Sequence, residues 1–141
     1  MCHRVGLAAL VLFSTAVTGG CGEKPTTPTI LAARAQFFVA DVPVPEKFDL
    51  DRRKSADSFR PGHREIKHIY VGRTDPQLVG NFYRLKMTEY QWELIDRKLK
   101  NGVEFLNYRK GDEKCAIRIE ETPNRFFGST TRVCVEIQAT D

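Results

Sequence analysis

The sequence has few of the residues that build metal and redox centres, with 3 His and 4 Cys among 141 residues. Two of the histidines, His63 and His68, flank Glu65, but their spacing on a strand turns the two imidazoles to opposite faces. There is no glycine-rich phosphate loop and no Gly-x-Ser-x-Gly motif, and no pair of carboxylates stands out. We therefore expect no metal, no cofactor and no enzymatic activity.

A strong charge of one sign is also missing. The 22 Lys and Arg face 18 Asp and Glu, and the formal charge of +4 is too mild for a nucleic-acid-binding protein. The apolar run at residues 5–17 is shorter than the roughly 20 apolar residues that a helix needs to cross a bilayer. The length and the mixed composition instead predict one ordinary folded domain.

The N-terminus has the layout of a secretory signal peptide, since Arg4 precedes the apolar run and small residues follow it. The residues Val17-Thr18-Gly19-Gly20-Cys21 resemble the lipobox of bacterial lipoproteins. This resemblance implies cleavage before Cys21 and acylation of its thiol, which would anchor the chain to a membrane. Thr18 departs from the leucine preferred in that family, and the alternative is an ordinary signal peptide with an incidental cysteine.

These features divide the chain into three predicted parts. Residues 1–20 are a lipoprotein signal peptide, residues 21–40 a lipidated N-terminus with a flexible tether, and residues 41–141 a single globular domain. Within the tether, Glu23–Thr29 is rich in Pro and Thr, which is typical of an extended spacer. The next segment, Ile30–Val39, is compatible with a short helix or a first strand. The resemblance places the mature chain at the bacterial cell envelope, facing the periplasm, with the inner or outer membrane unresolved.

The domain combines one helix with several strands. Thr74 or Asp75 can cap a helix that has Pro76 at its first position, and apolar residues at helical spacing continue it to about Met87. Residues 88–100 fit either a second helix or a strand, and we favour the strand. Further strands are predicted at Glu65–Val71, in a polar and irregular form within Phe48–Phe59, and at residues 103–110, 114–120 and 131–138.

The loop Gly111-Asp112 ties two of these strands into a hairpin. A two-residue loop pairs Lys110 with Glu113, which places every apolar pair of the two strands on one face. Together the elements predict an α+β fold: a mostly antiparallel sheet of four to six strands with one amphipathic helix packed on one face.

If Cys21 is lipidated, Cys115 and Cys134 are left as an even pair in an oxidising compartment, which makes a disulfide a candidate. The strand pattern argues against it, because Cys115 shares a face with apolar residues whereas Cys134 lies on the polar side of its strand. Matching the apolar faces puts Val135 opposite Cys115. A disulfide and a buried free Cys115 both stay open.

Two other features have a functional and a structural interpretation. The basic cluster in Asp51–Lys54 fits a contact with anionic lipid or a solvated turn, and we favour the turn. Phe126 and Phe127, in the predicted connection Glu121–Ser129, can cap the core or form an exposed apolar contact, and we favour the core.

Several short motifs resemble a pattern in uncharacterised bacterial lipoproteins over nearly the whole mature chain. They are Asp41-Val42-Pro43-Val44-Pro45, Tyr70-x-Gly72, Phe82-Tyr83, Met87, Trp92, Lys110-Gly111, Cys115-x-Ile117-x-Ile119 and Ser129-Thr130-Thr131. The resemblance brings no assigned activity. We expect a lipid-anchored envelope protein that binds another envelope protein or assists envelope assembly. The alternative is a small-ligand-binding or stress-related periplasmic lipoprotein. The expected partners are the membrane, through the lipid, and an envelope protein, but no nucleic acid.

Overall fold

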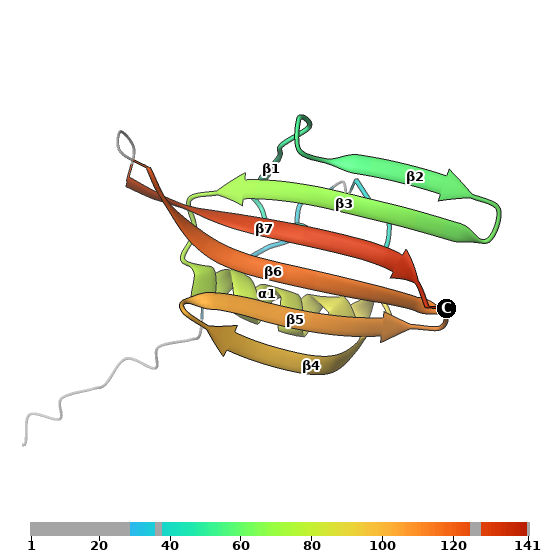
Figure 1. Cartoon of the computed structure of the whole chain (residues 1–141). Coiled ribbons are helices and arrows are strands. Elements are labelled where there is room, and N and C mark those ends of the chain that lie inside the picture. Colours follow the sequence, from blue (N-terminus) through green and yellow to red (C-terminus); the bar gives the residue numbers. More distant parts are fainter. Residues whose placement is uncertain (1–28, 36–37, 125–127, 141) are drawn as a thin grey trace, which may run out of the picture.

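The computed structural model describes residues 29–35, 38–124 and 128–140, and these form an α+β fold. Seven antiparallel strands make one sheet, in the order β1-β3-β7-β6-β5-β4, with β2 beside β1 along the same edge of β3 (Figure 1). The elements are β1 (Asp49–Leu50), β2 (Ala56–Arg60), β3 (His63–Gly72), α1 (Pro76–Glu89), β4 (Glu93–Lys100), β5 (Val103–Lys110), β6 (Glu113–Asn124) and β7 (Gly128–Ala139).

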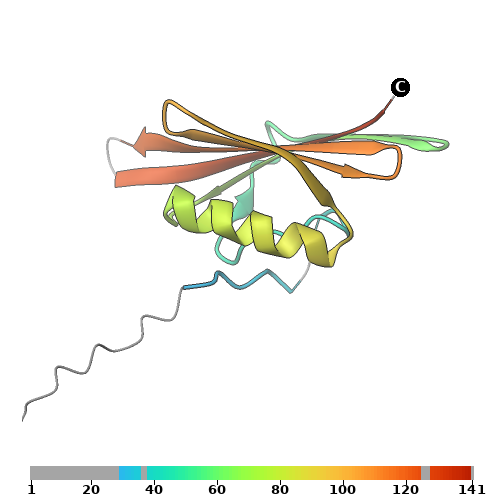
Figure 2. The same ribbon diagram turned by 90° about the horizontal axis from the view of Figure 1, so that it is seen from below.

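The sheet is larger than the predicted four to six strands. The polar stretch Phe48–Phe59 supplies two strands rather than one, because a turn at residues 52–54 separates β1 from β2. Each of them pairs with a different part of β3. The helix covers one face of the sheet, and the opposite face carries no second layer of described residues (Figure 2).

The helix begins as the sequence predicts. The Asp75 side chain accepts a hydrogen bond from the Gln77 N–H at 2.7 Å, and Pro76 occupies the first turn, where its missing donor costs nothing. The helix buries Val79, Phe82, Tyr83 and Met87 against the sheet and ends at Glu89, two residues after the predicted end. Gln91 then adopts a left-handed φ of 67°, which turns the chain into β4. The strand favoured for residues 88–100 is therefore confirmed at Glu93–Lys100, whereas Thr88 and Glu89 still belong to α1.

The hairpin between β5 and β6 also has the predicted register. Lys110 pairs with Glu113, Tyr108 with Cys115 and Leu106 with Ile117. A second tight turn, Asn101-Gly102, joins β4 to β5 with φ values of 52° and 78°, as a turn with two left-handed residues requires. The pairing of β4 with β5 shifts between Leu94 and Asp96, so that a β-bulge sits at Ile95.

The register between β6 and β7 differs from the prediction. Cys115 pairs with Ile137 and not with Val135, which pairs with Ile117. A shift by two residues keeps every side chain on its face, so the apolar pattern alone does not distinguish the two registers. The ladder also continues to the pair Asn124 and Gly128, so much of the expected connection 121–129 is strand. Phe126 and Phe127 lie outside the described residues.

The segment before β1 packs on the helix side of the sheet (Figure 2). The described residues of Ile30–Val39, predicted as a helix or a strand, form neither. The chain folds back on itself, with the Arg34 N–H donating to the Val44 carbonyl at 2.8 Å. Val39, Val42, Val44 and Phe48 are buried in the core. Gly72 makes room for the Phe48 ring, since a Cβ there would lie 2.6 Å from it. The packed structure therefore includes residues that precede Asp41.

Candidate functional site

The two cysteines of the domain are free thiols on opposite faces of the sheet, so the candidate disulfide between Cys115 and Cys134 is not formed. Cys115 points into the core, and burial raises the pKa of its thiol well above the ordinary value. Cys134 lies on the outer face beside Glu136, and burial raises the pKa of its thiol too. Both thiols are protonated at neutral pH, which argues against a nucleophilic role. Cys21, the predicted lipidation site, lies outside the described residues.

His68 is buried, and both of its ring nitrogens have partners. Its Nε2 lies 2.5 Å from Asp57 Oδ1, and its Nδ1 lies 2.9 Å from the Tyr70 hydroxyl. Burial, with the nearby Asp57 carboxylate, raises the pKa of Tyr70. His63 is exposed on the other face of β3. His68 thus links β2 to β3 through its contact with Asp57. Among the described residues, no group of three or more His, Cys, Asp or Glu could hold a metal ion.

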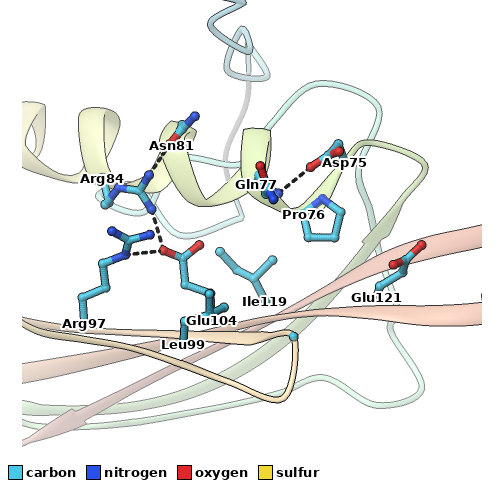
Figure 3. A pocket seen from close by; sticks show the side chains of 11 residues that line it. Asp75, Pro76, Gln77, Asn81, Arg84, Arg97, Leu99, Glu104, Ile119 and Glu121 are labelled. Carbon is cyan, nitrogen blue, oxygen red and sulfur yellow. Dashed lines mark hydrogen bonds and ion pairs between the residues drawn. The ribbon is translucent and has the colours of Figure 1, made fainter.

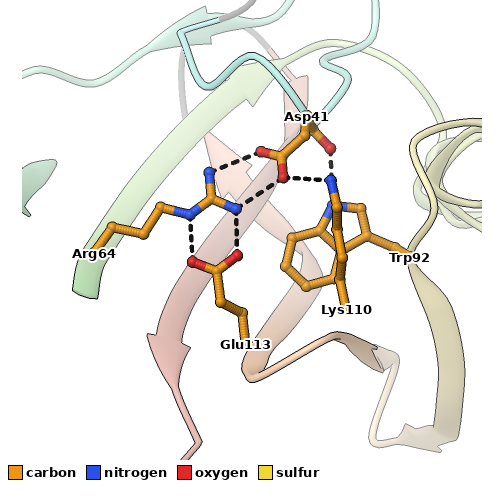
Figure 4. A network of polar contacts seen from close by, with 5 residues as sticks. All are labelled: Asp41, Arg64, Trp92, Lys110 and Glu113. Atoms are coloured by element: carbon orange, nitrogen blue, oxygen red, sulfur yellow. Dashed lines mark hydrogen bonds and ion pairs between the residues drawn. The ribbon is translucent and has the colours of Figure 1, made fainter. Parts of the chain in front are cut away.

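A network of charges closes one end of the layer between helix and sheet (Figure 4). Arg64, at the start of β3, donates two hydrogen bonds to Asp41 at 2.8 and 2.9 Å and two to Glu113 at 2.6 Å. Lys110 donates to Asp41 at 2.9 Å and lies over the Trp92 ring. The Trp92 indole N–H donates to the Asp41 carbonyl at 2.9 Å. Two cations and two carboxylates balance, and we call this set the closed end.

The closed end shifts the pKa of Asp41. Burial by itself would raise it, but the hydrogen bonds from Arg64 and Lys110 outweigh burial and hold the pKa below its usual value. The hydrogen bonds that Arg64 donates to Asp41 and Glu113 raise the pKa of Arg64 further above its usual range. Asp41 and Arg64 are therefore charged at neutral pH, and each of the four side chains has a partner of opposite charge. Such a network fastens the segment before β1 to the sheet and leaves no charge free for a ligand.

A cleft of about 540 Å³ opens at the other end of the layer (Figure 3). The first half of α1 forms one wall, and β4, β5, their connecting turn and the end of β6 form the other. Gln77, Asn81 and Arg84 lie on one side of the helix, at spacings of four and three residues, and face this space. We call this set of elements the open end.

Glu104 stands at the centre of the open end, with a side chain only 9% exposed. Its Oε1 accepts from Arg84 of the helix at 2.5 Å and from Arg97 of β4 at 2.7 Å. Arg84 also donates to Asn81. Gly80 faces the carboxylate, because a Cβ there would lie 1.9 Å from Glu104 Oε2. A buried carboxylate between two arginines is stabilised by charge-assisted hydrogen bonds, which offset its desolvation.

Aromatic side chains fill the space between the two ends. Trp92, Tyr70, Tyr83, Tyr108 and Phe48 are fully buried there. The hydroxyls of Tyr83 and Tyr108 have no hydrogen-bond partner within the described part of the chain, and burial raises the pKa of both phenols. Along the helix, the cleft therefore extends from Asp75 to Arg84 and no further.

The sequence interpretation missed this site, although two of its residues carry a signal. Glu104 alternates with Leu106 and Tyr108, and Glu121 follows Ile117 and Ile119 with the same period. Each is a carboxylate at the end of a row of alternating residues that faces the core. Polar residues at such positions mark the place where a core ends or a cleft begins.

The described residues contain no helix that is long and apolar enough to cross a membrane.

Comparison with known proteins identifies the family of the chain. A family model described as START domain-like matches residues 53–131, that is, 79 of the 141 residues. The matched span runs from β2 through β6 and into β7, and it includes all the walls of the cleft. No curated protein and no solved structure is significantly similar to the chain. Because the family model covers more than half of it, the chain belongs to the START domain-like family.

Proposed function

We propose that this protein is a ligand-binding module that takes a small molecule into the cleft at the open end. The cleft itself is the main support for this proposal. It has a volume of about 540 Å³, the side chains of Arg84, Arg97 and Glu104 converge on it, and Ile119 lies in its floor. A concave site with an apolar floor and a few converging polar groups is the usual form of a small-molecule site. START-like domains are generally binding modules, which supports binding without a chemical step.

The module would act at the bacterial cell envelope. This part of the proposal rests on the lipobox-like residues that end at Cys21 and on the apolar run that precedes them. The thiol of Cys21 would carry the lipid, and the Pro- and Thr-rich residues after it would hold the domain near the bilayer surface. An intact mass of the protein extracted from membranes tests it. A chain that starts at Cys21 and is heavier by acyl groups is expected, and an unmodified chain would contradict the anchor.

The binding function is tested by blocking the cleft. Gln77 lines the cleft from an exposed helix position, so Gln77→Trp fills the space without disturbing the core. Native mass spectrometry of the gently purified protein should show a bound small molecule in the wild type and its loss in the variant. The test can use a chain that begins at Gly22, because the packed core lies between Leu31 and Ile137.

Glu89→Trp is the matched control, because Glu89 is an exposed residue of the same helix that does not line the cleft. It should retain the bound molecule. Equal amounts of ligand in the blocked variant, or no ligand in either protein under any growth condition, would contradict the proposal.

A second candidate function is the binding of an envelope protein. It is favoured by β4, which ends the sheet and carries exposed apolar side chains at Leu94, Ile95 and Leu99. An unpaired edge with apolar side chains can accept a strand from another chain. In vivo crosslinking should then capture one specific partner at this edge, and Ile95→Lys should abolish the capture. If crosslinking works in the controls but captures no partner at β4, the protein-binding candidate is wrong and ligand binding is the function that stays.

A further inference from the structure

The cleft at the open end has two poles of opposite charge. Arg84 and Arg97 share the single carboxylate of Glu104, which leaves this pole with a net charge of +1. Asp75 and Glu121 line the other part of the cleft (Figure 3). Within the described ranges, no Lys or Arg forms an ion pair with either carboxylate, so this part of the cleft offers negative charge.

Both poles have free hydrogen-bonding capacity. Arg97 uses only its Nε toward Glu104, and its terminal nitrogens have no partner among the described residues. Its side chain is 50% exposed, so a ligand can reach it. At the other pole one oxygen of Asp75 accepts from the Gln77 N–H, whereas Glu121 makes no side-chain hydrogen bond within the described part of the chain.

Apolar surface separates the poles. Ile119 is part of the buried core and forms the floor, and Pro76 and Leu99 flank it. The Leu99 side chain is 70% exposed, so an apolar part of a ligand would cover it. The cleft thus offers guanidinium groups at one end, carboxylates at the other end and hydrocarbon between them.

We infer that the ligand of this cleft is a zwitterionic small molecule, with its anionic group on Arg97 and Arg84 and its cationic group near Asp75 and Glu121. The inference rests on the proposed ligand-binding function. A purely anionic ligand would meet the carboxylates of Asp75 and Glu121, and a purely cationic one would meet the arginine pair. Only a ligand with both charges matches both poles, and an apolar portion between or beside them fits the floor.

Four probes with the same eight-carbon tail test the inference by titration calorimetry below their micelle concentrations. They are octylphosphocholine, which is zwitterionic, octyl sulfate, octyltrimethylammonium and octyl glucoside. We expect the zwitterion to bind the wild-type chain at least about tenfold more tightly than each of the other three, which corresponds to about 1.4 kcal/mol. Gln77→Trp should abolish the binding of all four.

Two substitutions separate the poles. Arg97→Gln should weaken the zwitterion and octyl sulfate about tenfold, whereas octyltrimethylammonium should bind as well as before or more tightly, because a repelling charge is gone. Glu121→Gln should weaken the zwitterion and octyltrimethylammonium, whereas octyl sulfate should bind as well as before or more tightly. Lys114→Gln and Glu65→Gln make the same charge changes at exposed positions that do not line the cleft, and should have little effect. These controls separate a local contact from the overall charge of the protein.

The outcomes distinguish the inference from the function on which it rests. If a singly charged or neutral probe binds as tightly as the zwitterion and Gln77→Trp abolishes it, the cleft binds ligands but the inference is wrong. If no probe binds, the charge of the molecule that co-purifies decides: a zwitterion supports the inference, and a molecule with one charge or none overturns it. If nothing binds and nothing co-purifies, the proposed function itself is wrong.

Discussion

The closed end and the open end of the helix–sheet layer use the same kinds of side chain to different effect. At the closed end Arg64 and Lys110 meet two carboxylates, and every charge is matched. At the open end Arg84 and Arg97 meet one carboxylate, and a cleft lies beside them. The difference lies in what surrounds the charges. The segment before β1 covers the closed end, and nothing among the described residues covers the open end (Figures 2 and 3).

This contrast separates charges that hold the fold from charges that can serve a ligand. A balanced and covered network contributes to stability, since each group has its partner and would be left buried and alone without it. An unbalanced and accessible group contributes little to stability and keeps its capacity for a partner from outside. Substitutions at the two ends should therefore differ in what they change: the free energy of unfolding at one end and ligand binding at the other.

The largest effect is expected at the centre of the closed end. Arg64→Met removes four hydrogen bonds, which leaves Asp41 with Lys110 alone and takes from Glu113 its partner in the network. Breaking a buried ion pair costs about 3–5 kcal/mol, and partial exposure of Arg64 brings the expected loss to about 2–3 kcal/mol in urea unfolding.

Lys67→Met is the matched control for this prediction. It removes the same charge from the same strand, but the ion pair of Lys67 with Glu136 is half exposed on the outer face. We expect the urea midpoint of this variant to stay close to that of the wild type. If Arg64→Met shifted the midpoint no more than Lys67→Met does, the closed end would not hold the fold as described.

A smaller effect, with a change of sign, is expected at the open end. Gly80→Ala adds a Cβ that would lie 1.9 Å from Glu104 Oε2. Overpacking costs about 1–3 kcal/mol, whereas alanine gains about 1 kcal/mol over glycine in a helix. In the wild type we expect a net loss of about 1 kcal/mol. In a Glu104→Ala background the clash is gone, and Gly80→Ala should stabilise the protein.

A double-mutant cycle in urea measures this reversal. The interaction energy between the two positions should be clearly non-zero. If Gly80→Ala destabilised both backgrounds equally, Gly80 would be needed for some reason other than the carboxylate of Glu104. The position of that carboxylate against the helix would then be wrong.

The sequence predicts the closed and open ends unequally. Local chemistry identifies the helix start at Asp75 and the hairpin at Gly111, because both depend on residues that are adjacent in the chain. The alternation of β5 and β6 also puts Glu104 and Glu121 on the core face. It does not indicate that a bulge near Ile95 turns Arg97 toward the helix, so the pairing of Arg97 with Glu104 could not be predicted.

The closed end shows the limit more clearly. Asp41 contacts Arg64 and Lys110, which are 23 and 69 residues away in sequence. No periodicity connects these positions, and the motif around Asp41 indicates only an extended chain with two prolines. Its place against the sheet is decided by tertiary packing, namely by the burial of Val39, Val42 and Val44. Packing begins inside the predicted tether of residues 21–40, because Leu31, Ala33 and Val39 contact the core, and a composition rich in small apolar residues does not mark that point.

The smallest effect, and the one most specific to the closed end, is its response to acid. The pKa of Asp41 is lowered in the folded protein, so Asp41 contributes stability above its unfolded pKa of about 3.9 and loses it as the pH falls through the lower folded value. Trp92 is the only tryptophan and donates to the Asp41 carbonyl. Below about pH 4 its fluorescence should therefore change before the far-ultraviolet circular dichroism of the sheet does. Asp41→Asn removes the titrating group and should flatten this early change. If the fluorescence and the circular dichroism changed together in both proteins, the closed end would open only when the whole domain unfolds. Protonation of Asp41 would then have no local effect on the closed end.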